Sequence, residues 1–401
     1  AGNRKTWTWS GWVKRGNLND KIMFGTGTLS GTANDMVLWF NGSDQIAFYR
    51  NSGYILRTNA VYRDPSAWYH IVLHIDTTNA TATDRQRLWV NGEEVTDFNQ
   101  DNNLALNTDY PVNNTIQHAL GQTGTYGSSY YDGYMSEINF IDGQALGPNS
   151  FGELDPYTNK WVPKDASGLT FGTNGFYLDF TNSSNLGNDV SGNGNDFTSS
   201  GLTIDDQVTD SPTDNFCTWN YLDKGPVSAI LSNGNLGVSA SGGTRQGVRG
   251  TIGVSSGKWY WEMTKGAVQS GSVGVGSQET AFVTDGYVGN SATSWGYLNS
   301  GLKATNSTTA AYGATFTTSD VIGVALDMDA GSITFYKNNT SQGVAYTGLS
   351  GTVFPMEYTG ASVENITDFG QLGYTYTPPT GFKALSTDNL PSSEAGIAAF
   401  V

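Results

Sequence analysis

The chain has 401 residues, a formal net charge of −16 and only 14% charged residues. This length exceeds that of one small domain, so two or three domains are expected. Because phosphate binding needs basic patches, the acidic balance argues against nucleic acid and anionic membranes as partners. The single cysteine, Cys217, excludes an intrachain disulfide bond.

The residue types favour β-structure throughout the chain, which holds 51 glycines, 21 tyrosines, 18 phenylalanines and 11 tryptophans. Aromatic residues fit strands, and glycine fits the turns between them. We therefore predict an all-β protein with two antiparallel β-sandwich (jelly-roll) domains, joined by an acidic Gly/Asn-rich linker. No apolar run is long enough to cross a bilayer, so membrane insertion is not expected.

Residues 1–160 are predicted to form the first sandwich. Short apolar segments follow one another, from "TWTWSGWVK" through "MVLWF", "WYHIVLHID" and "RLWVNG" to "YMSEINFIDG". Turn signals separate them at the spacing of sandwich strands. In "WVNGEEV", the pair Asn91-Gly92 suits the tight turn of a hairpin. The chain begins directly in strand-like sequence, which we interpret as a piece of a longer protein.

The three tryptophans of the first segment do not share one face. Trp7 and Trp9 alternate, so both are expected to fill the sandwich. Trp12 falls on the opposite face unless a bulge at Ser10-Gly11 resets the register. Packing under a covering layer is the favoured interpretation of Trp12, and a binding platform that stacks on a glycan is the alternative.

Residues 161–215 are predicted to form the acidic linker. Nine aspartates and no lysine or arginine lie between Asp165 and Asp223. The stretch is very rich in turn-forming residues. Within it, "GFYLDF" reads as one strand that is able to dock on a neighbouring sheet.

The linker also contains a candidate calcium site in "NDVSGNGND", residues 188–196. Hard cations bind clusters of oxygen donors, and this Gly-rich turn is flexible enough to wrap around one. The predicted calcium ligands are Asp189, Asn193, Asn195 and Asp196. A plain cluster of Asx turns explains the same residues equally well.

Residues 216–385 are predicted to form the second sandwich. Its segments include "GKWYWEMT", "GSVGVGS", "DVIGVALDMDAGSITFYKNN" and "VFPMEYTG". In "LDMDAGSITFYKN", Asp-Ala-Gly separates an apolar strand from an alternating one, as in a hairpin. Trp259 and Trp261 alternate and are expected in the core. Residues 386–401 read as a C-terminal tail.

The sequence shows no arrangement typical of a catalytic centre. In a strand, His70 and His74 lie roughly 13 Å apart, too far to share one metal ion. Glu153 and Asp155 come nearest to a glycosidase carboxylate pair, but Pro156 follows at once and a third acid is missing. Nucleophile-elbow and phosphate-loop motifs are absent. We therefore expect no enzyme activity.

The first domain resembles the laminin-G/concanavalin-A-like jelly rolls over most of residues 1–150. The resemblance rests on "WTWSGWVKRG", "AWYHIVLHIDTT", "RLWVNGEEV" and "YYDGYMSEINFIDGQAL", which come in the family's order. In that family a tryptophan commonly stands at the position of Trp12, which implies an architectural role. Related domains also carry an "SGNGN" stretch near a metal ion, which implies the calcium ligands named above.

The second domain resembles a SPRY domain over about residues 250–372. The resemblance rests on "SSGKWYWEMT", "SVGVG", "SWGYLNSG", "DVIGVALDMDAGSITFYKNNTSQGVAY", "VFPMEYTG" and "TDFG". SPRY domains bind partners through loops at one end of the sandwich. This implies Trp295, Tyr297, Phe282 and Tyr287 as binding candidates. The alternative is that Trp295 and Tyr297 are only a structural pair.

The two domains and their linker together resemble a type of virion protein of tailed phages of marine bacteria. This implies a non-enzymatic tail fibre, head fibre or capsid decoration on the virion surface. The expected partners are other virion proteins and host-surface glycans or proteins, and a homo-oligomer on the particle is expected. The alternative is a secreted or cell-surface lectin-like adhesion protein of a bacterium. A glycan hydrolase has less support, because the carboxylate set is absent.

Overall fold

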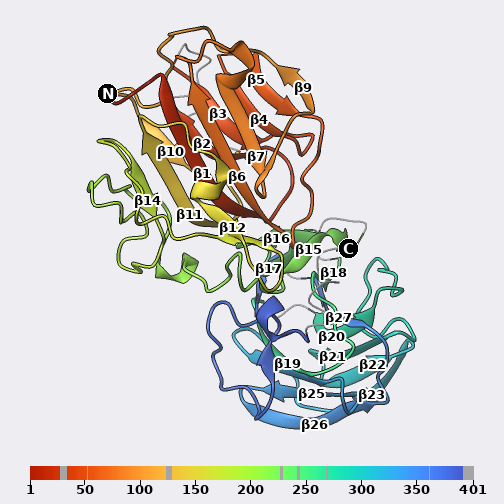
Figure 1. Cartoon of the computed structure of the whole chain (residues 1–401). Helices are drawn as coiled ribbons and strands as arrows, with labels where there is room; N and C mark the ends of the chain where they lie inside the picture. The colour runs from red at the N-terminus through yellow and green to blue at the C-terminus, as the bar shows by residue number, and fades with distance from the viewer. Residues whose placement is uncertain are drawn as a thin grey trace. The chain divides into compact units, whose positions relative to one another are not determined.

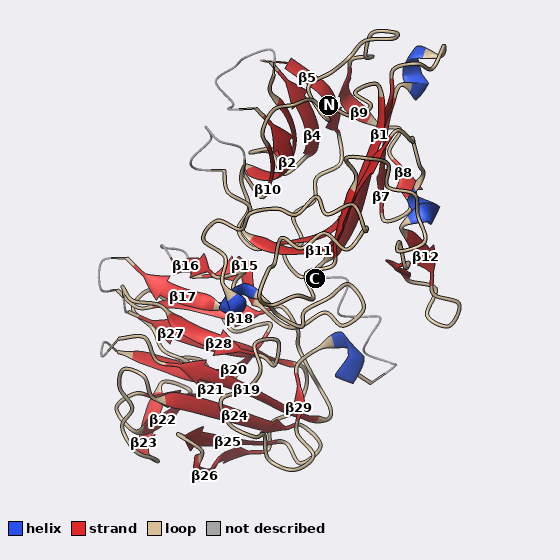
Figure 2. Ribbon diagram, turned by 90° about the vertical axis from the view of Figure 1, so that its left-hand side faces the viewer, coloured by secondary structure: helices blue, strands red, loops and turns tan. Residues whose placement is uncertain are grey.

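The computed structural model describes residues 1–27, 34–51, 53–122, 129–225, 229–241, 244–267, 270–360 and 362–391. The chain forms two compact units. The first comprises Ala1–Asp64 and Trp68–Gln207, and the second comprises Pro65–Ala67 and Val208–Val401. Nearly all regular structure is strand (Figure 2), which confirms the predicted all-β class. Residues 392–401 of the predicted tail lie outside the described residues.

The first sheet of the first unit has six antiparallel strands (Figure 1). In spatial order they are β14 (Phe176–Leu178), β11 (Gly133–Asp142), β1 (Thr6–Arg15), β6 (Trp68–Asp76), β7 (Gln86–Val90) and β8 (Glu93–Glu94). The segment "GFYLDF" supplies β14, which pairs with β11 from Ile138↔Leu178 to Phe140↔Phe176. The structure therefore assigns the stretch from 161 to 207 to the first unit, whereas the sequence suggested a separate linker over 161–215.

The second sheet of the first unit also has six strands. In spatial order they are β10 (His118–Leu120), β2 (Lys21–Thr26), β3 (Met36–Phe40), β4 (Ile46–Arg50), β5 (Gly53–Thr58) and β9 (Phe98–Asp101). A separate two-stranded hairpin consists of β12 (Gly152–Leu154) and β13 (Trp161–Pro163).

Aromatic rings join the two large sheets of the first unit. Trp7 of β1 meets Phe48 of β4 edge-on, with ring centroids 6.1 Å apart. Trp9 stacks on Phe24 of β2 at 6.3 Å. Both tryptophans are fully buried, which confirms that they fill the sandwich.

Trp12 keeps the opposite parity along β1. The pairing of β1 with β6 is continuous from Thr6↔Asp76 to Lys14↔Trp68. The ladder with β11 does shift between Ser10 and Trp12, where β1 advances by two residues and β11 by three. The extra residue therefore lies on β11, where Glu137 has a φ of 51°, and the bulge leaves the register of β1 unchanged.

The second unit contains two larger antiparallel sheets. The first follows the order β15 (Trp219–Lys224), β18 (Gln246–Gly250), β27 (Val353–Thr359), β20 (Gly271–Ser277), β21 (Ser294–Leu298), β22 (Leu302–Thr305) and β23 (Thr308–Ala311). The second follows the order β16 (Ala229–Ser232), β17 (Gly237–Ala240), β28 (Asn365–Asp368), β19 (Lys258–Thr264), β24 (Val321–Asp327), β25 (Ser332–Lys337) and β26 (Thr340–Thr347). The short β29 (Lys383–Ala384) runs parallel to β19.

The core of the second unit holds Trp259 and Trp261, which are buried as the alternation in β19 predicts. Helical structure among the described residues is limited to the 3₁₀ turns η1 (Ala82–Asp84), η2 (Pro148–Ser150), η3 (Ile204–Asp206) and η4 (Thr387–Asn389). In this part of the chain no helix has the length and apolar character needed to cross a membrane.

Candidate functional site

Trp12 lies inside a stack of rings on the outer face of the first sheet. Its ring stacks on His70 of β6, with centroids 4.7 Å apart, and His70 stacks in turn on Trp161 of β13 at 6.0 Å. Only 3% of Trp12 is exposed. The side chain therefore offers no platform to a ligand. This burial corrects the alternative binding role of Trp12 and agrees with the favoured interpretation, packing under a covering layer.

Ser10 and His70 form a buried pair with the residue types of a catalytic dyad. The proton between them, however, lies on the histidine and not on the serine. The Trp161 indole N–H donates to His70 Nδ1 at 2.9 Å. The other ring nitrogen, Nε2, must then carry the proton and donate it to Ser10 Oγ, 2.9 Å away. A general base needs the reverse direction. Burial also lowers the pKa of His70 to about 3, so the imidazole stays neutral and structural.

In the second unit, Trp295 and Tyr297 both point from β21 toward the core. Tyr297 is fully buried, and its hydroxyl donates to the carbonyl oxygen of Ala314. Its ring lies 5.3 Å from that of Phe335. Trp295 is half-buried and packs at the edge of the same core. The predicted contact role of Tyr297 is corrected to a structural one, because no part of the ring reaches solvent.

Phe282 and Tyr287 lie on a loop that arginine side chains hold in place. The guanidinium of Arg249 lies 5.0 Å from the Phe282 ring centroid, and that of Arg245 lies 5.9 Å from the Tyr287 ring centroid. Arg245 also forms an ion pair with Asp285 at 3.0 Å. Both rings are half-buried and keep some accessible surface. Their role in partner binding stays a prediction.

The structure brings the four predicted calcium ligands together in one turn. The Asp189 carboxylate accepts hydrogen bonds from the backbone N–H groups of Tyr177, Ser191 and Asn195 at 2.8–2.9 Å, and from the Ser191 hydroxyl. Burial raises the pKa of Asp189, but these hydrogen bonds outweigh it and leave the pKa below its usual value. Asp196 Oδ1 accepts from the Asp189 backbone N–H at 2.8 Å.

The amide nitrogens of Asn193 and Asn195 tie this turn to the chain before β14. Both donate to the carbonyl oxygen of Gly175 at 2.9 Å. The bond from the Ser191 N–H to Asp189 Oδ1 is an Asx turn, as the alternative interpretation expects, whereas the bonds to Gly175 join the turn to a distant part of the chain. Within the described residues, no group of three or more His, Cys, Asp or Glu side chains is placed to hold a metal ion. Calcium binding by the turn stays a prediction.

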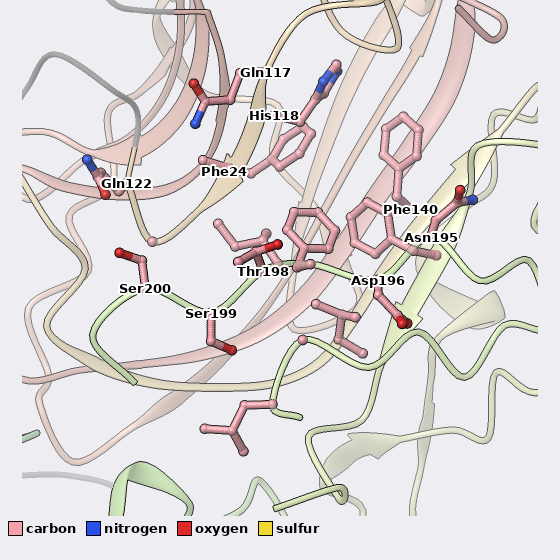
Figure 3. A pocket seen from close by; sticks show the side chains of 18 of the residues that line it. Phe24, Gln117, His118, Gln122, Phe140, Asn195, Asp196, Thr198, Ser199 and Ser200 are labelled. Carbon is pink, nitrogen blue, oxygen red and sulfur yellow. The ribbon is translucent and has the colours of Figure 1, made fainter. Parts of the chain in front are cut away.

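A cavity of about 860 Å³ opens at the edge of the first unit (Figure 3). It lies where the edge strands β10 and β14 belong to different sheets, so that the sandwich is not closed there. Apolar side chains form much of its wall, namely Phe24, Phe140, Phe176, Leu178, Phe180 and Phe197. The volume lies within the range of small-ligand sites.

Neutral polar side chains complete the lining of this cavity. Six of these amides and hydroxyls come from two stretches of chain that face each other in Figure 3, namely Gln117, Gln122, Asn195, Thr198, Ser199 and Ser200. Asp196 is the acidic residue among the described lining residues, which include no lysine or arginine. Such a lining favours a neutral ligand over an anion, because none of its described side chains is a lysine or arginine that could balance a negative charge.

His118 lines the same cavity but is fully engaged by the backbone. Its Nε2 accepts the Asn113 backbone N–H at 2.9 Å, so Nδ1 carries the proton and donates to the Ile116 carbonyl at 2.8 Å. Burial lowers the pKa of His118. The ring is therefore neutral and has no free nitrogen for proton transfer.

Sequence reasoning missed this cavity. Its walls come from β2, β10, β11, β14 and the segment from 186 to 202, which are distant in the chain. One available signal was Phe197, an aromatic residue inside a stretch of turn formers. Phe197 packs edge-on against Phe176 at 4.7 Å, which shows that the stretch folds back onto the sandwich.

The first unit thus carries a cavity of ligand size. Residues 2–149 match the family model described as the concanavalin A-like lectin/glucanases superfamily. Residues 258–370 match the SPRY domain model. The chain therefore contains a laminin-G-like, concanavalin A-like domain followed by a SPRY domain.

Similar proteins cover mainly the second unit. The ATP-dependent RNA helicase DDX1 of Xenopus laevis is 31% identical over 170 residues, which are 42% of this chain and 22% of the helicase. Human SPRY domain-containing SOCS box protein 1 is 32% identical over 26% of this chain and 44% of its own length. The chain thus spans less than half the length of these relatives. The crystal structure of the SPRY domain of human HERC1 is 20% identical, with a TM-score of 0.32, and covers 37% of this chain and 96% of that domain.

Proposed function

We propose that this chain is a non-catalytic adhesion protein whose first unit binds a neutral carbohydrate in the cavity between β10 and β14. The observation that carries the proposal is the lining of that cavity. Aromatic rings cover the apolar faces of sugars, while amides and hydroxyls both donate to and accept from sugar hydroxyl groups. The lining combines these two kinds of group and contains no lysine or arginine among its described residues.

The proposal extends to where the protein works. The pairing of a concanavalin A-like domain with a SPRY domain, together with the acidic stretch that follows residue 161, supports a place on the surface of a phage virion. There the chain would serve as a fibre or decoration protein and would bind host-surface glycans or neighbouring virion proteins. Several copies on one particle would raise the avidity of a weak single site.

A glycan array of neutral oligosaccharides, probed with the full chain, tests the carbohydrate site. We expect binding that Gln117→Ala and Ser199→Ala each weaken at least fivefold, because each loses hydrogen bonds to the ligand. Gln278→Ala serves as the matched control, since Gln278 is an exposed glutamine of the second unit. Binding that all three variants retain would place the carbohydrate elsewhere and refute the cavity as its site.

Adsorption to host cells tests the biological setting. Virions that lack the chain are expected to attach less well than complete virions. If complete and depleted virions attach equally, the host-binding part of the proposal is refuted. Detection of the chain on bacterial cells, with none in purified particles, would instead establish the bacterial adhesion alternative.

A further inference from the structure

Three polar side chains of the second unit meet in a site that water does not reach. Lys265 and Asn365 are each 1% exposed, and Glu357 is fully buried. The Lys265 ammonium nitrogen, Nζ, donates to Asn365 Oδ1 at 3.2 Å. The Asn365 amide nitrogen donates to Glu357 Oε1 at 2.6 Å. Burying three such groups costs folding free energy, so the presence of this site calls for an explanation.

The pairing of the strands brings these three side chains together. Lys265 directly follows β19, and Asn365 begins the neighbouring strand β28. Glu357 reaches Asn365 from β27 of the other sheet. At Gly266 a Cβ atom would lie only 1.7 Å from the Glu364 carbonyl oxygen. Only glycine allows this approach, which holds the end of β19 against the start of β28.

The surroundings of Asn365 activate its carboxamide toward attack. Oδ1 accepts a second hydrogen bond, from the backbone N–H of Gly266 at 2.9 Å. The Gly266 N–H draws electrons from the amide carbon and is placed to stabilise the negative charge that develops on Oδ1. The bond from Lys265 holds its Nζ beside the carboxamide before the attack. Glu357 Oε1 contacts the nitrogen that would leave, while its other oxygen accepts from the Thr367 hydroxyl.

Burial also adjusts the two titratable groups in the directions that the reaction needs. It lowers the pKa of Lys265, which makes the nucleophilic neutral amine more accessible. It raises the pKa of Glu357 to about 7, so this carboxyl group can both accept and release a proton near neutral pH.

We propose that Lys265 and Asn365 join spontaneously in an intramolecular isopeptide bond. The neutral Nζ attacks Cγ of Asn365, and a Nζ–Cγ bond forms. Glu357 accepts the proton released by Nζ and delivers it to Nδ2, after which the Cγ–Nδ2 bond breaks and ammonia leaves. No oxidant or cofactor is required, and the product is a secondary amide that covalently links β28 to the residue after β19.

The bond would anchor the short strand β28 to β19, the central strand of its sheet. β28 lies between β17 and β19 in the eight-stranded sheet. A cross-link between residues far apart in sequence restricts the unfolded chain, and it resists separation of the two strands under load. Such resistance suits an adhesion protein, although the inference does not depend on the proposed carbohydrate site.

Intact mass spectrometry of the full chain tests the proposal. We expect a mass about 17 Da below that of the sequence, the mass of one ammonia molecule. Tryptic digestion should yield one branched peptide that contains both Lys265 and Asn365. A full sequence mass, with the two residues recovered in separate linear peptides, would overturn the proposal.

Variants distinguish this bond from other losses of ammonia. Lys265→Arg and Asn365→Ala are each expected to restore the full mass of the variant sequence. Glu357→Gln should also do so while keeping both partners, since it removes only the proton carrier. Circular dichroism checks that each variant is folded. A deficit of 17 Da that persists in folded Lys265→Arg would refute the assignment.

Lys224→Arg is the matched control. Burial also lowers the pKa of Lys224, but its Nζ donates to the backbone carbonyl of Ala229 at 3.0 Å and not to a side-chain carboxamide. This variant is expected to keep the full deficit. Loss of the deficit in Lys224→Arg would contradict the role of the site geometry.

Discussion

Acidification from pH 7 to pH 5 is expected to destabilise the first unit through His70. Burial lowers the pKa of the folded imidazole from 6.5 to about 3. Unfolding therefore takes up a proton in this range, so the stabilisation is complete above pH 6.5 and is lost as the pH falls toward 3. At ~1.4 kcal/mol per pH unit, the roughly 1.5 units between 6.5 and 5 amount to about 2 kcal/mol.

Differential scanning calorimetry of the wild type and His70→Gln at several pH values measures this effect. Glutamine does not titrate, so the variant loses the contribution of this site to the pH dependence. In a unit of this size, about 2 kcal/mol corresponds to a shift of roughly 4–8 °C in the transition temperature. The difference in transition temperature between the wild type and His70→Gln should therefore decrease by roughly 4–8 °C between pH 7 and pH 5. Parallel curves over the whole range would refute the buried neutral state of His70.

Three further outcomes are expected. Trp12→Ala should destabilise the first unit by about 3–5 kcal/mol in urea unfolding, because it leaves a cavity beside the His70 ring; a loss below ~1 kcal/mol would contradict the packing role. Tyr297→Phe should cost about 1 kcal/mol in the same assay, since the Ala314 carbonyl loses its donor; an unchanged stability would argue against this bond. EDTA distinguishes the two interpretations of the turn at Asp189. The Asx-turn interpretation expects unchanged melting of the first unit, because the carboxylate already accepts four hydrogen bonds; a fall of several degrees would establish the predicted calcium site.

The candidate sites show that a sequence pattern does not predict whether a side chain is exposed. A strand pattern assigns Trp12 to the outer face of its sheet, but only β13 and its Trp161 decide that this face is covered. The same holds for Tyr297, whose polar and small neighbours in sequence suggested exposure. Its ring is buried because Phe335 comes from a distant strand. Local composition reports on turns and strands, whereas exposure depends on what packs against them.

The sequence alone determined the all-β class and the inward faces of strands such as the one with Trp7 and Trp9. Alternation along a strand is a local property, and it survives whatever the strand packs against. Only the tertiary structure decided that the acidic stretch after residue 161 builds one wall of a cavity. It likewise decided that Lys265, Glu357 and Asn365 meet in one dry site. Both depend on pairings between strands far apart in the chain, which no local pattern records.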